Sequence, residues 1–106
     1  MAKLTVFWTM TAIKQRNLVF DYWNSRNNSK TYSRKLNMAI KERIDALKHN
    51  PEMGKLTTVK SVRGISLGHY SILYKKEESL IYIMAFWDNR QNPHKLYKLL
   101  NPTGVS

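Results

Sequence analysis

The sequence predicts an α+β fold in which an antiparallel pair of helices packs on a mainly antiparallel sheet. Two observations predict it: apolar residues recur at helical spacing between residues 12 and 48, and strand-like apolar patterns follow between residues 55 and 87. The chain has 106 residues, 42% of them hydrophobic, which suffices for one modest core. We therefore expect a single domain over residues 1–106.

A strand is predicted first, within residues 3–9, KLTVFWT, because β-branched and aromatic residues are frequent there. The threonines at positions 9 and 11 offer an N-cap for a helix over residues 12–26. Apolar residues recur along this segment at helical spacing, and the turn-forming stretch NSRNNS then ends the helix.

The second helix is predicted over residues 30–48 and ends before Pro51, since the residue that precedes a proline avoids the α region. The connection from the first helix is short, which indicates an antiparallel hairpin. One stripe of the second helix is expected to pack against the sheet, and its residues are Tyr32, Leu36, Ile40, Ile44 and Leu47.

The second half of the chain is expected to supply the antiparallel strands. Residues 55–62 and 64–67 are short and weakly patterned, whereas HYSILYKK alternates, with Tyr70, Ile72 and Tyr74 on one face. After the turn KEES, the segment SLIYIMAFW is apolar on both faces, which predicts a strand inside the sheet. A short C-terminal helix should follow, capped by Asn92 with Pro93 at its first position.

Charge and composition narrow the possible partners. Eighteen Lys and Arg residues against seven Asp and Glu residues give a net charge of +11, which favours a polyanion, nucleic acid first, or an acidic protein. The chain has no cysteine, and its three histidines are far apart in sequence, so we expect neither a metal nor another cofactor. We find no signal peptide and no apolar run long enough for a membrane span, and we expect a cytoplasmic protein that binds no membrane.

Four basic residues should form a ridge along the second helix. Lys30, Arg34, Lys41 and Lys48 fall on one line of that helix. Such a ridge is a candidate track for phosphates or for another target, and the alternative is a solvated helix face.

Arg90 stands where the apolar run ends, in FWDNRQNPHKL. We interpret it as the functional end of the sheet; a solvated strand exit is the alternative. Arg63 is expected to meet it if their two strands are neighbours. His69 and His94 are candidates for a cleft at the sheet edge, with a plain surface position as the alternative for each.

The order of elements, together with NPEMGKL, HYSILY and above all IYIMAFWDNRQNPHKL, resembles the RelE/ParE superfamily of bacterial toxins from type II toxin-antitoxin systems. The resemblance covers nearly the whole chain. It implies a cognate antitoxin, often acidic where it binds the toxin, and contact with operator DNA only through that antitoxin.

Two activities occur in this superfamily, and whether the chain is an enzyme stays open. RelE-like members cut ribosome-bound messenger RNA without a metal, and ParE-like members poison DNA gyrase. In this chain Gly64, Ser66 and Ser71 stand where the resemblance to RelE-like enzymes implies cations. A ribonuclease would need a variant catalytic set, which we take as Arg63, His69, Arg90, His94 and Tyr97.

The ParE-like reading needs only a shaped binding surface, and RQNPHKL resembles the ParE-like ending more than the RelE-like tail. We therefore favour a gyrase-binding toxin over the ribonuclease. A third alternative is an inactive basic binding domain of the same fold. On the gyrase reading, the candidate target-binding residues are those of the basic ridge and Arg90.

Overall fold

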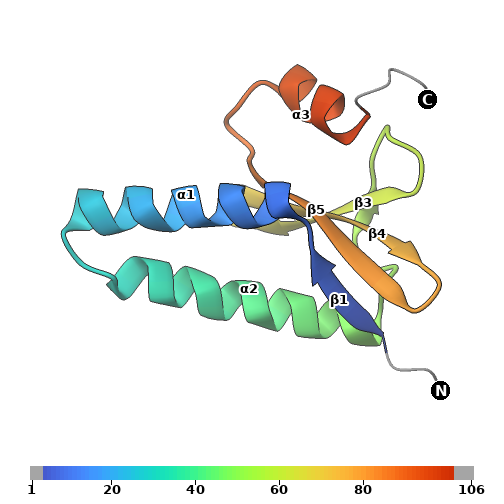
Figure 1. Ribbon diagram of the computed structural model, residues 1–106, viewed down its shortest axis with the longest axis horizontal. Helices are drawn as coiled ribbons and strands as arrows, with labels where there is room; N and C mark the ends of the chain where they lie inside the picture. Colours follow the sequence, from blue (N-terminus) through green and yellow to red (C-terminus); the bar gives the residue numbers. More distant parts are fainter. Residues whose placement is uncertain (1–3, 102–106) are drawn as a thin grey trace.

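The computed structural model describes residues 4–101, in which five strands form one sheet and three helices pack on it (Figure 1). The elements are β1 (Thr5–Trp8), α1 (Met10–Asn27), α2 (Thr31–His49), β2 (Lys55–Leu56), β3 (Val62–Leu67), β4 (Tyr70–Glu77), β5 (Leu80–Asp88) and α3 (Pro93–Leu100). The predicted α+β class is confirmed, with its N-terminal strand, helical hairpin and short C-terminal helix.

The strands lie in the order β1-β5-β4-β3-β2. β1 pairs with β5 in parallel, from Thr5 opposite Leu80 to Trp8 opposite Ile83, and the other pairs are antiparallel. β5 therefore lies between β1 and β4, which confirms the interior position that its apolar sequence predicted.

Side-chain caps start two of the helices where the sequence placed them. The Thr9 hydroxyl accepts a hydrogen bond from the Ala12 amide at 3.3 Å and donates one to the Ile83 carbonyl at 2.8 Å, so the start of α1 is tied to β5. The Asn92 side chain accepts from the His94 amide at 2.9 Å, and Pro93 occupies the first turn of α3.

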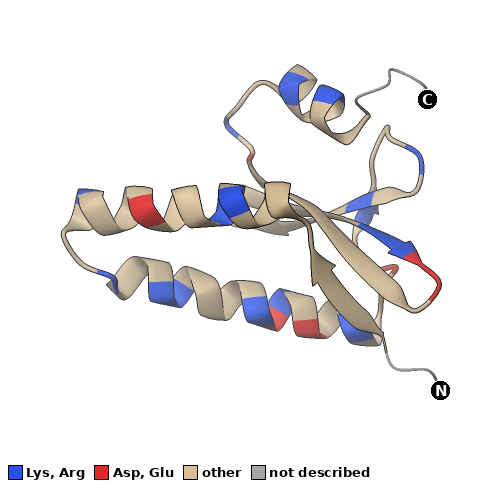
Figure 2. Cartoon of the chain, in the orientation of Figure 1, with Lys and Arg blue, Asp and Glu red and all other residues tan. Residues whose placement is uncertain are grey.

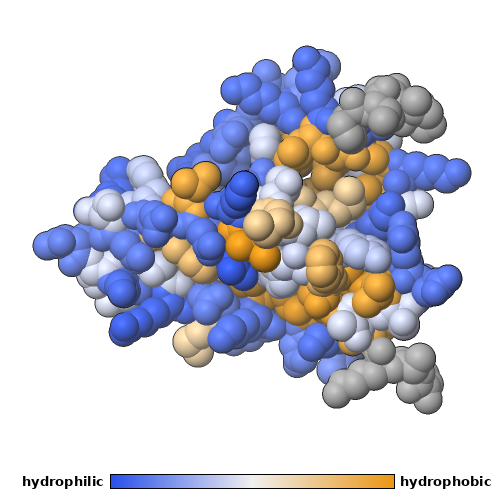
Figure 3. Space-filling view, viewed as in Figure 1, coloured by the Kyte–Doolittle hydropathy of each residue, from blue (hydrophilic) through white to orange (hydrophobic). Residues whose placement is uncertain are grey.

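The sheet is covered on both faces. The hairpin covers one face, where its buried residues meet those of β3, β4 and β5. α3 covers part of the other face, over Val62, Leu73, Ala85 and Trp87. At the surface, apolar side chains lie beneath α3 and near β1 and β5, while the two long helices are mostly hydrophilic (Figure 3).

A register shift in β5 divides its side chains between the two faces. Leu73 pairs with Ala85 and Tyr74 pairs with Ile83, so Met84 is an extra residue in β5. Ile81 and Ile83 consequently face the hairpin, and beyond the shift Phe86 does so as well, while Ala85 and Trp87 face α3.

The predicted stripe of α2 is confirmed at Leu36, Ile40 and Leu47, which are buried, and Ile44 is half-buried beside them. The prediction is wrong for Tyr32, which is 37% exposed. Tyr32 lies in the first turn of α2, at the loop end of the hairpin that extends past the sheet (Figure 1), and its ring packs on Trp23, with centroids 4.6 Å apart.

Tyr74 fixes the connection from α2 to the sheet. Its buried hydroxyl donates to the Pro51 carbonyl at 2.7 Å and accepts from the Gly54 amide at 3.0 Å. A Cβ at position 54 would lie 2.6 Å from this hydroxyl, which explains the glycine. Burial raises the pKa of Tyr74 above its ordinary value of 10.0.

We expect Tyr74→Phe to lower the free energy of unfolding by about 2 kcal/mol, because the Gly54 amide and the Pro51 carbonyl lose their partner in a buried place. The wild type should also lose stability above pH 10.0, since its folded state holds the tyrosine proton more tightly than the unfolded chain, and the variant should lack this loss. Urea unfolding across pH measures both. Tyr82→Phe, at a half-exposed ring, is the control and should change little; an equal loss there would contradict the assignment.

Candidate functional site

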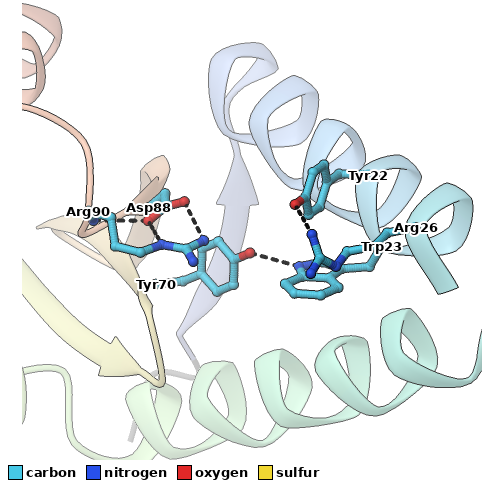
Figure 4. A network of polar contacts seen from close by, with 6 residues as sticks. All are labelled: Tyr22, Trp23, Arg26, Tyr70, Asp88 and Arg90. Carbon is cyan, nitrogen blue, oxygen red and sulfur yellow. Dashed lines mark hydrogen bonds and ion pairs between the residues drawn. The ribbon is translucent and has the colours of Figure 1, made fainter.

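A pocket of about 590 Å³ opens between α1 and the adjoining ends of β4 and β5. Figure 4 shows the side chains around part of it. Its walls come from three parts of the chain, and the lining residues are Gln15, Leu18, Val19, Tyr22, Tyr70, Phe86, Trp87, Asp88, Arg90 and Gln91.

The floor of this pocket is a fixed aromatic pair. Tyr70 and Phe86 are buried and stack with centroids 5.1 Å apart, and the Trp23 indole donates to the Tyr70 hydroxyl at 2.9 Å. The Gln15 side chain reaches across from α1 and accepts from the Phe86 amide at 2.9 Å. Hydrogen bonds from two turns of α1 thus hold the rings in place.

The rim on the α1 side is apolar and exposed. Leu18 is 68% exposed and Tyr22 is 51% exposed, although both carry large side chains. The Tyr22 hydroxyl accepts from the Arg26 guanidinium at 3.1 Å (Figure 4). An exposed apolar rim above an aromatic floor suits an apolar anchor from a partner.

The opposite rim is an ion pair. The Arg90 guanidinium donates to both oxygens of the Asp88 carboxylate, at 2.9 and 2.8 Å, and the Arg90 amide donates to the same carboxylate at 2.9 Å (Figure 4). These hydrogen bonds lower the pKa of Asp88 and raise the pKa of Arg90. The charge of Arg90 is therefore offset by a carboxylate in direct contact.

Loop contacts bring His69 close to this ion pair. The Asn89 amide donates to the His69 carbonyl at 2.8 Å, and the Ser71 hydroxyl donates to the Asn89 side chain at 2.8 Å. Of the five residues that a ribonuclease would use, His69 and Arg90 are thus neighbours at one end of the sheet. Ser71 lies beside them and adds no positive charge there.

Arg63 lies elsewhere. It pairs with Tyr74 in the sheet and donates to the Gly54 carbonyl at 2.8 Å and to the Glu52 carbonyl at 3.2 Å. β4 separates β3 from β5, and Tyr70, not Tyr74, lies opposite Asp88. Arg63 and Arg90 therefore do not converge, and Arg63 holds the loop that follows α2.

His94 and Tyr97 form a third group. Both lie on α3 and line a pocket of about 370 Å³ with Thr58, and the Tyr97 hydroxyl accepts from the Asn101 side chain at 3.1 Å. The candidate catalytic residues are consequently divided among three places: Arg90 lines the first pocket, Arg63 lines a second pocket with Tyr74, and His94 and Tyr97 line a third.

The four ridge residues lie as the sequence indicated. Lys30 precedes α2, and Arg34, Lys41 and Lys48 follow along it; all four are exposed. Blue segments recur along α2 in Figure 2. Beside the ridge, a groove of about 290 Å³ is lined by Trp8, Arg16, Asn37, Ile40, Lys41, Ile44, Asp45 and Lys48.

Sequence reasoning missed the pocket itself. The sequence pattern places Tyr70 on one strand face with Ile72 and Tyr74, and it singles out neither Leu18 nor Trp23. The available signal was Leu18 with Tyr22, two large residues four apart on the first helix, both of which the structure leaves exposed. No sequence pattern pointed to the bond between Trp23 and Tyr70, because 47 residues separate them.

Within the described part of the chain, no three His, Asp or Glu side chains gather as metal ligands would. No helix of that part combines the length and apolarity that crossing a bilayer requires.

The sequence matches, over residues 6–93, a family described as the ParE toxin of type II toxin-antitoxin system, parDE. Among solved structures, the fold is similar to a chain of the chromosomal ParDE TA system from P. aeruginosa, with a TM-score of 0.69. The two sequences are 19% identical over 81% of this chain and 96% of that chain, which shows a shared fold. A comparison with curated proteins finds no match.

The ion pair between Arg90 and Asp88 predicts a lowered pKa for the Asp88 carboxyl. The Asp88 carboxyl should have a pKa below its ordinary value of 3.8, and Arg90→Ala should move it back up, because the guanidinium hydrogen bonds are the largest cause of the shift. His69→Ala is the control and should raise it less, since His69 acts only through its charge. Carboxyl-carbon NMR titration measures both; an unchanged pKa in Arg90→Ala would show that the pair does not form in solution.

Proposed function

The chain belongs to the family of ParE toxins of type II toxin-antitoxin systems, and from this membership we propose that it inhibits growth by binding DNA gyrase. The match over residues 6–93 carries the proposal, because it favours the ParE branch of the superfamily over the RelE branch. Gyrase acts on chromosomal DNA, so the proposal also puts the chain in the cytoplasm.

The chemistry of the site supports a binding role more than RNA cleavage. Cleavage through the 2′-hydroxyl needs a base, an acid and cations within reach of one phosphate. Arg90 already binds a carboxylate, and Arg63 lies with Gly54 in another part of the molecule. A phosphate at Arg90 would have to approach Asp88, whose negative charge opposes it.

A cognate antitoxin is implied by the family, and we place its main anchor in the pocket between α1 and the ends of β4 and β5. An apolar side chain could enter beside Leu18 and Tyr22 and rest on Tyr70, while acidic residues meet the basic surface. The antitoxin would then offset part of the +11 charge, and operator DNA would be recognised through it.

We expect the purified chain to inhibit supercoiling of relaxed plasmid by gyrase and to leave ribosome-bound transcripts uncut. Arg90→Ala should weaken the inhibition, because Arg90 is exposed and is one of the residues that we assign to target binding. Supercoiling gels and primer extension on ribosome-bound messenger RNA are the two measurements. Codon-phased cuts by the wild type that fall a hundredfold or more in Arg90→Ala, about 3 kcal/mol, would instead make Arg90 a catalytic residue of a ribonuclease.

Leu18→Asp should weaken antitoxin binding by about tenfold or more, because it puts a charge where an apolar anchor is to be buried. Met38→Asp is the matched control: Met38 is 63% exposed on α2, away from the pocket, and its variant should bind normally. Isothermal titration with the protein encoded beside the toxin measures the two affinities. Equal affinities for both variants would exclude this pocket as the anchor site.

A further inference from the structure

The ridge on α2 consists of cations that no acidic side chain neutralises by direct contact. Within residues 4–101, the ion pairs are Lys75 with Glu77 and Arg90 with Asp88, and neither involves α2. Over residues 30–48 the basic residues are Lys30, Arg34, Lys35, Lys41, Arg43 and Lys48, and the acidic ones are Glu42 and Asp45. The helix therefore carries a net positive charge, and most of its coloured segments are blue (Figure 2).

A fifth cation joins the ridge from α1. Arg16 lies over the Trp8 ring, 4.7 Å from its centroid, and lines the groove beside α2 together with Lys41 and Lys48. Asp45 also lines this groove, so three cations stand there against one carboxylate. The packing on Trp8 holds the Arg16 guanidinium on the α2 side of α1.

We propose that this surface, the ridge together with Arg16, binds the phosphate backbone of duplex DNA without reading its sequence. The toxin would then contact DNA itself, in addition to any contact made by an antitoxin. The α2 helix has 19 residues and so is about 28 Å long, enough to lie along several phosphates of a stiff duplex.

The side chains of the ridge favour a duplex over a single strand. Proteins that hold single strands stack the bases on exposed aromatic rings. The one aromatic residue of α2 is Tyr32, which lies off the ridge and packs on Trp23, and the Trp8 ring in the groove is covered by Arg16. Cations without free aromatic rings suit phosphates and not bases.

The surface is separate from the pocket that we assign to the antitoxin. No residue of the ridge, nor Arg16, lines that pocket, which lies on the side of α1 that faces β4 and β5. A toxin that engages its antitoxin could therefore keep this surface open to DNA. The inference rests on the charges of α2 and stands whether or not gyrase is the target.

The test compares two variants that each lose four positive charges. The ridge variant replaces Lys30, Arg34, Lys41 and Lys48 by Gln, and the control replaces Lys60, Lys76, Lys95 and Lys98 by Gln; all eight residues are exposed. A third variant, with Lys30, Lys41 and Lys48 replaced by Arg, keeps the charge. Fluorescence anisotropy records binding to a duplex of arbitrary sequence and about 20 base pairs, from about 50 to 200 mM salt.

We expect the wild type, the control and the Lys→Arg variant to bind with a steep salt dependence. The ridge variant should bind at least about tenfold more weakly, with a slope of log affinity against log salt lower by about 3.6, which is 0.9 for each lost phosphate contact. Its circular-dichroism spectrum and unfolding temperature should match those of the four-lysine control, which shows that it is folded.

Three results would overturn the inference. The first is an equal loss in the ridge variant and the control, which would mean that only net charge matters. The second is tighter binding of a single strand of equal length than of the duplex, which would make single-stranded nucleic acid the partner. The third is no duplex binding by the wild type at the lowest salt.

Discussion

The burial of β5 on both faces is the constraint on which the rest of the structure depends. One face must meet the hairpin and the other must meet α3, and the extra residue at Met84 makes both possible within nine residues. Without that shift, strict alternation would send Phe86 away from the hairpin. The pocket floor that Phe86 forms with Tyr70 is thus a product of the strand's irregularity.

Local patterns made much of the fold predictable. Thr9 and Asn92 cap their helices as their residue types suggested, and the Leu36, Ile40 and Leu47 spacing gave the buried face of α2. The prediction was wrong for Tyr32 because the apolar residues of α2 continue at helical spacing past the point where the sheet ends. Periodicity reports which residues share a face, and it does not report how far the neighbouring layer extends.

The site was much less predictable, because it is assembled from long-range contacts. The proximity of Arg63 to Arg90 depended on strand order, and the sheet places β4 between their strands. Arg90 was predicted as a site residue from its place at the end of the apolar run. Its hydrogen bonds to Asp88, two residues earlier, determine which chemistry its guanidinium can support. An arginine that already binds a carboxylate in two places serves recognition of shape and charge better than stabilisation of a developing phosphate charge.

The parallel pairing of β1 with β5 has a consequence for synthesis of the chain. β1 is made first, but its one partner in the sheet begins at Leu80, so 75 positions separate Thr5 from the residue opposite it. Closing so long a loop is slow compared with forming the α1–α2 hairpin. In a nascent chain the sheet beneath the hairpin therefore stays incomplete until the last strand has been translated, and so does the pocket floor, to which that strand contributes Phe86.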